Sequence, residues 1–232
     1  MRNLKIEGCM NLESVSMSEA PHAALQRLSI SWCSKLVSFA GEGLAAPNLT
    51  HLQVRLCEKL EALPRDMKSL LPSLQTFEIY GCANICRLPE GGLPPNLKSL
   101  GVGGCEEQLR DLSWMANFHA LTHLTISGYH CDNIKSYPEV GSLPHLPSLT
   151  TLNICWFYNL ETLECNELLR LTSLQQLYIS DCKKLENMEG EKLPPSLLLL
   201  QIQACGLLGE HCKNKHQLIW PKISHIPDIN VF

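Results

Sequence analysis

The stretch Leu49–Pro64, LTHLQVRLCEKLEALP, contains the pattern on which the whole chain is built. Its recurring positions give the template L-x-x-L-x-I/V-x-x-C-x-x-L-x-x-L-P. The template fits nine times, and its first position falls at Met1, Leu25, Leu49, Leu74, Leu97, Leu121, Leu149, Leu174 and Leu197. These anchors lie 23 to 28 residues apart, so the chain consists of repeats.

The fourth and sixth template positions are apolar in every copy, as in Leu28/Ile30 and Leu124/Ile126. Such alternation predicts a short strand whose even positions face a core. A period of roughly 20–29 residues with this pattern is typical of leucine-rich repeats. The sequence therefore predicts an α/β solenoid, a leucine-rich-repeat horseshoe with a concave parallel β-sheet.

The ninth template position, which we call the ladder position, holds a cysteine in most copies. These residues are Cys9, Cys33, Cys57, Cys82, Cys105, Cys182 and Cys205. In the sixth copy Cys131 comes two residues late, which indicates a two-residue bulge after Ser127, and Phe157 replaces the cysteine in the seventh copy. We expect these thiols to be reduced, to point into the core and to donate weakly to nearby loop carbonyls. A disulfide between stacked equivalents would need Cβ atoms closer than the roughly 4.8 Å strand spacing.

The segments between strands favour loops and short 3-10 turns. After each ladder residue, apolar residues recur every three positions, as in Cys57/Leu60/Leu63, and we expect them to point inward. Proline and glycine in connectors such as Pro89–Asn96 disfavour a long helix. The convex side is therefore expected to carry little helix.

Domain boundaries follow from where the template stops. Residues 1–205 are predicted to form the solenoid and residues 206–232 a C-terminal cap, with Trp220, Ile223, Ile226 and Ile229 covering the last repeat. Met1 already occupies an anchor with no polar capping segment before it. We therefore expect the chain to be a piece of a longer array, truncated at its N-terminus.

Composition argues against several functional classes. The formal net charge of −4 provides no basic excess for nucleic acid or an anionic membrane. No continuous apolar run resembling a secretory signal starts the chain, and no run is long enough to cross a bilayer. These features predict a cytoplasmic protein that does not insert into a membrane.

Motifs for catalysis or metal binding are weak. Gly101–Gly104 lacks the third glycine and the strand–helix context of a dinucleotide site, so we interpret it as small residues in a strand. His211, Cys212 and His216 lack the four paired ligands of a structural zinc site. No serine lies in a G-x-S-x-G elbow. The sequence predicts no enzyme, no metal and no cofactor in this chain.

The concave face is instead the candidate binding surface, because solenoids present an extended face and because Trp, Tyr and Arg dominate binding hot spots. Outward template positions supply the predicted partner-binding residues Arg27, Trp32, His51, Gln53, Arg55, Glu78, Tyr80, His123, Asn153, Trp156, Gln176, Tyr178 and Asp181.

The repeat LxxLxIxxCxxLxxLP, the connector PEGGLPPNLKSL (Pro89–Leu100) and the closing WPKISHIPDI (Trp220–Ile229) together resemble a plant family. It is the C-terminal leucine-rich-repeat region of coiled-coil nucleotide-binding leucine-rich-repeat disease resistance proteins. The coiled coil, the nucleotide-binding domain and the phosphate-loop motif of that family are absent from these residues. Any ADP or ATP switching is expected only in that missing domain.

The resemblance implies a recognition module of an intracellular immune receptor. Such a module senses pathogen effectors or guarded host proteins and restrains the nucleotide-binding switch domain through intramolecular contact. An alternative is the substrate-receptor arm of an F-box ubiquitin ligase, since cysteine-bearing repeats of similar length occur there. That alternative needs an F-box upstream and does not account for the WPKISHIPDI ending.

Overall fold

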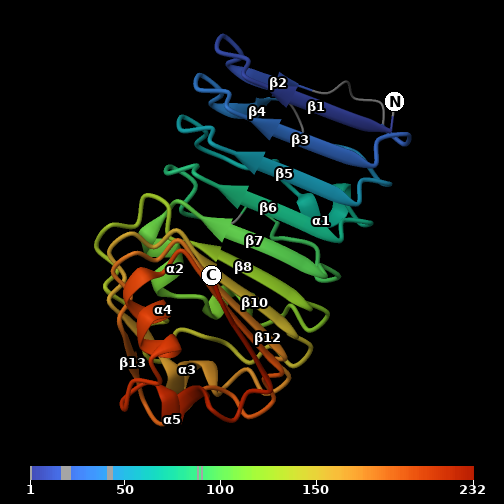
Figure 1. Cartoon of the computed structure of the whole chain (residues 1–232). Coiled ribbons are helices and arrows are strands. Elements are labelled where there is room, and N and C mark those ends of the chain that lie inside the picture. The colour runs from blue at the N-terminus through green and yellow to red at the C-terminus, as the bar shows by residue number, and fades with distance from the viewer. Residues whose placement is uncertain (1, 17–21, 41–43, 88, 90) are drawn as a thin grey trace. The chain divides into compact units, whose positions relative to one another are not determined.

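A computed structural model describes residues 2–16, 22–40, 44–87, 89 and 91–232 of the chain. The chain divides into two compact units, Met1–Cys105 and Glu106–Phe232, which we call the N-terminal and C-terminal units (Figure 1). The predicted anchor Met1 and connector residue Glu90 lie outside the described residues.

Both units are stacks of short parallel strands. In the N-terminal unit the sheet order is β1 (Asn3–Glu7), β3 (Arg27–Ser31), β5 (His51–Arg55), β6 (Thr76–Tyr80) and β7 (Ser99–Gly103). In the C-terminal unit it is β8 (His123–Ser127), β10 (Thr151–Cys155), β12 (Gln176–Ser180), β14 (Leu199–Gln203) and β15 (Asp228–Val231). All of these except β15 cover template positions three to seven. The predicted leucine-rich-repeat solenoid with parallel sheets is confirmed.

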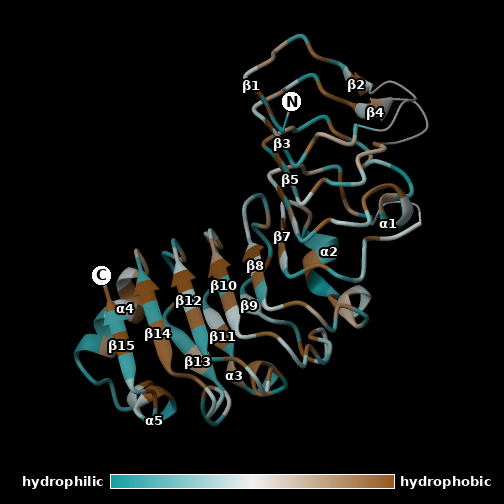
Figure 2. Cartoon of the chain, turned by 90° about the vertical axis from the view of Figure 1, so that its right-hand side faces the viewer, coloured by the Kyte–Doolittle hydropathy of each residue, from teal (hydrophilic) through white to brown (hydrophobic). Residues whose placement is uncertain are grey.

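The strands pair in register, so equivalent residues stack on one another. Leu28 pairs with Leu52, and Leu152 pairs with Leu177. Positions four and six are buried in the strands that follow β1, whereas Leu4 and Ile6 of β1 are half-buried. Because each fully buried Leu or Ile contributes roughly 1.5–3 kcal/mol, the stacked apolar rows hold the repeats together. Apolar and polar segments mix along the strands of the C-terminal unit (Figure 2).

Each strand ends at a residue with left-handed backbone conformation directly before the ladder position. These residues are Gly8, Trp32, Leu56, Gly81, Gly104, His130, Trp156, Asp181 and Ala204, with φ between 52° and 109°. The turn aims backbone N–H groups at the next repeat: Trp32 N donates to Arg55 O at 3.1 Å, and Trp156 N donates to Ser180 O at 3.1 Å. Only glycine adopts this conformation without steric cost.

The ladder cysteines fill the turn that follows. Cys33, Cys57, Cys82, Cys182 and Cys205 are buried, and their Sγ atoms lie 3.3 to 3.6 Å from the carbonyl oxygen two residues earlier. The thiols therefore donate to the strand-end carbonyl, not to a separate loop. Cys9 departs from the prediction because it is exposed.

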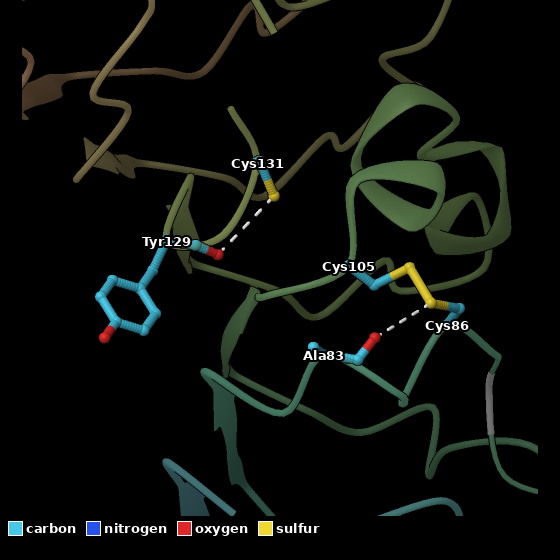
Figure 3. The surroundings of a disulfide bond; sticks show 5 residues. All are labelled: Ala83, Cys86, Cys105, Tyr129 and Cys131. Atoms are coloured by element: carbon cyan, nitrogen blue, oxygen red, sulfur yellow. Dashed lines mark hydrogen bonds between the residues drawn. A yellow bond between two sulfur atoms is a disulfide. The ribbon is translucent and has the colours of Figure 1, made fainter. Parts of the chain in front are cut away.

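The prediction that the ladder cysteines are reduced is wrong for Cys105. Cys86 and Cys105 form a disulfide with a Cα–Cα distance of 5.3 Å (Figure 3). Cys105 is a ladder residue but Cys86 lies in the preceding return segment, so the geometry of stacked equivalents does not apply. The bond closes a loop across the last repeat of the N-terminal unit.

The return segments contain short strands that the sequence analysis did not predict. They are β2 (Ser14–Ser16) and β4 (Ser38–Ala40), which pair in the N-terminal unit, and β9 (Ser136–Tyr137), β11 (Thr162–Glu164) and β13 (Asn187–Glu189), which form a parallel sheet in the C-terminal unit. Helical turns there are brief: α1 (Met67–Leu70), α2 (Glu106–Arg110), η1 (Ser113–Met115) and α3 (Cys165–Leu168). The predicted low helix content of this side is confirmed within the described residues.

The last segment leaves the repeat pattern. It forms α4 (Gly206–Lys213), α5 (Trp220–Ile223) and β15, and β15 pairs in parallel with β14. Ile223 and Ile226 are buried, while Trp220 and Ile229 are half-buried. Across the described residues, none of the helices is long and apolar enough to cross a membrane.

Candidate protein-binding face

The candidate surface is the side of each main sheet that faces away from the leucine core, which we call the open face. Template positions three, five and seven project from it, because successive residues of a strand alternate between faces. Position eight follows at the strand end and is counted with this face. The burial pattern of β5 and β6 shows this alternation: the even positions are buried, and the odd positions are half-buried or exposed.

In the N-terminal unit the parallel register joins several predicted residues into one polar network. Ser29 Oγ donates to Gln53 Oε1 at 2.9 Å, and Gln53 Nε2 donates to Glu78 Oε2 at 2.7 Å. Arg55 Nη2 donates to the same carboxylate oxygen at 2.7 Å. The Arg55 guanidinium also lies over the Tyr80 ring, 5.3 Å from its centroid.

Histidine at the third position is held by the adjacent threonine. His51 Nδ1 and Thr50 Oγ1 are 2.8 Å apart, and His123 Nδ1 and Thr122 Oγ1 show the same distance. Burial lowers the pKa of His51, and the positive charge of Arg27 lowers it further. The structure provides neither histidine with a serine or cysteine nucleophile as a hydrogen-bond partner within the described part of the chain.

A glycine makes room for the tyrosine of this network. A Cβ atom at Gly101 would lie 1.8 Å from Tyr80 Oη. The Tyr80 ring therefore extends across the backbone of β7. Val102 points into the core, which confirms the interpretation as a strand for Gly101–Gly103, whereas Gly104 follows the strand with a left-handed backbone.

In the C-terminal unit the predicted residues form a smaller network. Trp156 Nε1 donates to Asp181 Oδ2 at 3.1 Å, and Tyr178 Oη donates to Gln176 Oε1 at 3.3 Å. Asn153 Oδ1, in the middle of β10, is buried without a hydrogen-bond partner among the described residues. His123 is exposed on β8.

Sequence reasoning missed the aromatic residues that surround Trp156. Tyr129 lies 6.4 Å, centroid to centroid, from both Trp156 and Tyr158, and both contacts are edge-to-face. His130 packs against Tyr129 at 4.2 Å. Tyr129 and His130 belong to the two-residue bulge, and Tyr158 follows the strand. Two features of the sequence could have revealed these residues: the extra length of the sixth copy and the aromatic run at Trp156–Tyr158.

Two open-face tryptophans occupy a conformation that favours glycine. Trp32 is 56% exposed with φ 58°, and Trp156 is 43% exposed with φ 58°. A bulky residue in this region of φ carries a cost of about 1–2 kcal/mol. Both side chains leave about half of their surface exposed, so burial offsets only part of this cost.

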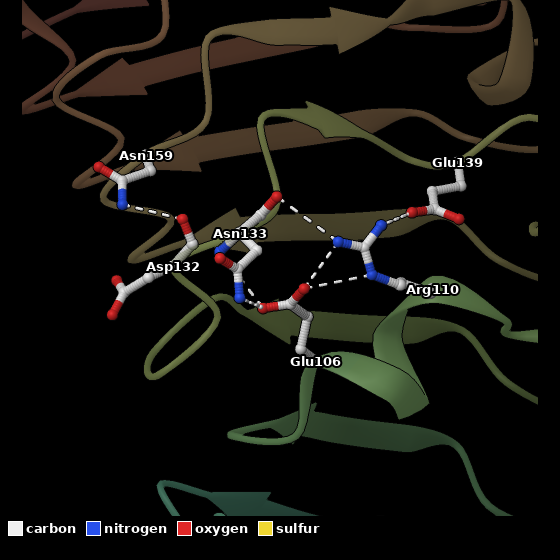
Figure 4. A network of polar contacts seen from close by, with 6 residues as sticks. All are labelled: Glu106, Arg110, Asp132, Asn133, Glu139 and Asn159. Carbon is white, nitrogen blue, oxygen red and sulfur yellow. Dashed lines mark hydrogen bonds and ion pairs between the residues drawn. The ribbon is translucent and has the colours of Figure 1, made fainter.

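A second polar cluster lies on the return side of the C-terminal unit (Figure 4). Arg110 of α2 bonds the Glu106 and Glu139 carboxylates, and Asn133 bonds Glu106 through its backbone and side-chain nitrogens at 3.2 and 3.1 Å. Burial acts to raise the pKa of Glu106, but the hydrogen bonds from Arg110 and Asn133 lower it overall. Asn159 Nδ2 donates to the backbone carbonyl of Asp132 at 2.9 Å.

Beside this cluster is an open depression of about 510 Å³, lined by Arg110, Lys135, Ser136, Pro138, Glu139, Val140 and Glu164. Ser136 Oγ donates to Glu164, and Arg110 is engaged by two carboxylates. No histidine lines the depression in the described structure. The arrangement ties neighbouring return segments together.

The histidine-rich segment near the C-terminus does not gather metal ligands. His211 and His216 stack at 4.5 Å, and His211 Nδ1 lies 3.1 Å from the carbonyl oxygen of Glu186. Among the residues that the structure describes, no three or more His, Cys, Asp or Glu side chains are grouped as a metal site would require.

Comparisons with known proteins find similarity to plant disease resistance proteins. The chain is 34% identical over 214 residues to "Putative disease resistance protein At3g14460" of Arabidopsis thaliana, which covers 90% of this chain and 15% of that protein. It is 28% identical to the disease resistance proteins RPP4 and RPS4B of the same plant, covering 69% and 82% of this chain. The chain spans only 15% and 18% of the lengths of those two proteins.

No protein-family model matches the chain. Among solved structures, a circular leucine-rich-repeat protein, CroV588, is similar with a TM-score of 0.52 at 20% identity, covering 87% of this chain and 30% of that one. At this identity the likeness concerns the fold. Taken together, the chain is a leucine-rich-repeat region that resembles those of plant disease resistance proteins.

Proposed function

We propose that this chain is the protein-recognition module of an intracellular, cytoplasmic plant immune receptor. It senses a pathogen effector or a guarded host protein and restrains a nucleotide-binding switch domain that is not part of this sequence. ADP or ATP would bind in that domain only. A receptor of the coiled-coil class fits the repeat, connector and closing motifs best.

The observation that carries the proposal is the pair of exposed tryptophans on the open face. Trp32 and Trp156 occupy strand-end positions where three other repeats have glycine, and both extend into solvent. Backbone strain and exposed aromatic surface both cost stability, and they are typical of sites kept for binding. The left-handed backbone is common to all nine repeats, so it is the exposed aromatic surface at Trp32 and Trp156 that supports recognition of a partner.

The mechanism needs only coupling between binding and a conformational equilibrium. A partner that binds the open face and disfavours the contact between this module and the switch domain shifts the receptor toward its active state. The shift is limited by the difference in affinity of the partner for the two states. The module needs no catalytic activity for this role.

The test uses the full-length receptor that contains this region, expressed in leaves and challenged with pathogen isolates that elicit a defence response through it. Arg55→Glu and Trp156→Ala should each abolish the response while receptor abundance on an immunoblot stays unchanged. Leu218→Ala, at an exposed apolar residue outside the strands, is the matched control and should respond normally. A full response from both open-face variants would refute the proposal.

A further inference from the structure

We propose that the aromatic cluster of Tyr129, Trp156 and Tyr158, together with the carboxylate of Asp181, binds an arginine side chain presented by the protein partner. The inference rests on the proposed function and names the chemistry of the partner at one part of the open face. We call these four residues the arginine site.

The N-terminal unit contains an occupied version of the same combination. There the guanidinium of Arg55 lies 5.3 Å from the Tyr80 centroid and is ion-paired with Glu78 at 2.7 Å. A carboxylate and an aromatic ring of β6 thus hold an arginine of the neighbouring strand β5 on the open face of this protein. The intramolecular example shows that the geometry of adjacent repeats suits the guanidinium group.

The C-terminal unit presents the ring and the carboxylate without the cation. The Trp156 indole donates to Asp181 Oδ2 at 3.1 Å, which fixes the carboxylate at the edge of the ring. Within the described residues, Asp181 Oδ1 has no hydrogen-bond donor, so it remains available to a second group. Trp156 and Tyr158 are 43% and 40% exposed. Tyr129 contacts both edge-to-face and so holds the cluster together.

No residue of the same unit supplies the missing charge. Its open-face strand positions and the strand-end positions that follow them include Asp228 and Asp181 but no lysine or arginine. Lys184, three residues after Asp181, donates to Asn159 Oδ1 at 2.8 Å. The cation–π contacts of the described chain involve Tyr80 and Trp220, and none involves the rings of the arginine site. An acidic, aromatic surface without cations is complementary to a positively charged partner.

Arginine suits the site better than lysine does. Its planar guanidinium can stack on an indole face and direct N–H groups at a carboxylate beside the ring. A lysine ammonium is compact and strongly hydrated, so it gains less from an exposed ring. The arginine site combines a flat ring with an adjacent carboxylate oxygen, which are the two features that a guanidinium can use at once.

The experiment titrates the full chain with the capped tripeptide Ac-Gly-Arg-Gly-NH₂ and follows the Trp156 indole N–H resonance by NMR. That resonance is assigned by its loss in Trp156→Phe. The arginine peptide should cause a saturable shift with a Kd in the millimolar range, as expected of about 4 kcal/mol from a single side chain. The lysine peptide and the neutral, isosteric citrulline peptide should bind at least about tenfold more weakly.

Variants separate a specific site from nonspecific attraction. Asp181→Asn keeps the shape of the side chain and tolerates the left-handed backbone, and it should weaken arginine binding by at least about tenfold. Trp32→Ala removes the equivalent tryptophan of the N-terminal unit and should leave the Trp156 titration unchanged. Both variants should retain the dispersed spectrum of the folded chain.

The outcomes are distinct from those that test the proposed function. Equal shifts with the arginine and citrulline peptides, equal binding of arginine and lysine, or an unaltered titration in Asp181→Asn would each overturn the arginine site. If the arginine site fails while Trp156→Ala still abolishes the defence response, the proposed recognition function stands and only the chemistry assigned to the partner is wrong.

Discussion

At the scale of single residues, the position directly before each ladder residue determines how a strand ends. The backbone there is left-handed in all nine repeats, although the residue is glycine in only three of them, Gly8, Gly81 and Gly104. The sequence places these residues at template position eight, except His130, which the bulge moves two residues later, but nothing in it reveals the sign of φ at Trp32 or Trp156. Tertiary pairing to the next repeat imposes that conformation on residues that do not favour it.

Two glycines at this position should respond differently to the same substitution. A Cβ atom at Gly104 would lie 3.0 Å from the backbone nitrogens of Gly81 and Cys82, whereas one at Gly8 would meet nothing within 4 Å. We expect Gly104→Ala to lower the free energy of unfolding by about 2–3 kcal/mol and Gly8→Ala by about 1 kcal/mol. Urea unfolding followed by circular dichroism measures both, and equal losses would contradict the proposed backbone clash.

At the scale of elements, the strands were predictable and the return segments were only partly so. Alternation at positions four and six specifies each five-residue strand. The short return strands β9, β11 and β13 have no such signal, because they are only two or three residues long and form by pairing with the neighbouring repeat. Local pattern cannot predict a strand whose stability depends on a partner from another repeat.

The seventh repeat shows how one substitution is accommodated by its neighbour. Phe157 replaces the ladder cysteine and is fully buried, and a Cβ atom at Gly128 would lie 2.2 Å from its ring. Phe157 also packs against Tyr137 at 5.0 Å. The bulge in the sixth repeat moves Cys131 along the chain and leaves Gly128 beneath the larger ring. The sequence revealed both irregularities but not their connection.

The strand interiors give a direct test of the inward and outward positions. Leu124 of β8 is 1% exposed, and Thr125 next to it faces outward and is half-buried. Leu124→Ala should lower the free energy of unfolding by about 2–5 kcal/mol, because the cavity cannot close fully. Thr125→Ala is the matched control, with an expected change within about 0.5 kcal/mol. Thermal or urea unfolding compares the two variants. A larger loss of unfolding free energy from Thr125→Ala would show that Thr125, and not Leu124, points into the core.

At the scale of the whole chain, the period of the repeats was sufficient to predict the leucine-rich-repeat solenoid. Two features were not predictable, because each joins residues at non-equivalent template positions. The disulfide links a return-segment cysteine to a ladder cysteine, and the aromatic cluster combines a bulge with a neighbouring strand end. The repeat template compares only equivalent positions, so it cannot predict contacts between residues at different template positions.

The division of the cysteines into buried and exposed residues predicts how fast their thiols react. Of the ten free cysteines, Cys9 is exposed and the others are buried. Burial raises the pKa of Cys155 to about 12 and that of Cys212 to about 11, so at pH 8 these thiols are almost entirely protonated. Their reaction with an alkylating reagent should increase as the pH rises toward those values, since the thiolate is the nucleophile.

The central claim is that leucines and isoleucines fill one side of the repeat strands, that most ladder thiols are buried in the turns that follow, and that the other side of the strands is free to bind. Iodoacetamide labelling of the native chain at pH 8, read residue by residue by mass spectrometry, tests it most directly. Cys9, and cysteines introduced by Gln176→Cys and Gln203→Cys on the open face, should label at least about a hundredfold faster than Cys57 and Cys182. In urea, where the stack is unfolded, the rates should converge. Labelling of Cys57 and Cys182 in the folded chain as fast as the introduced cysteines would contradict the claim.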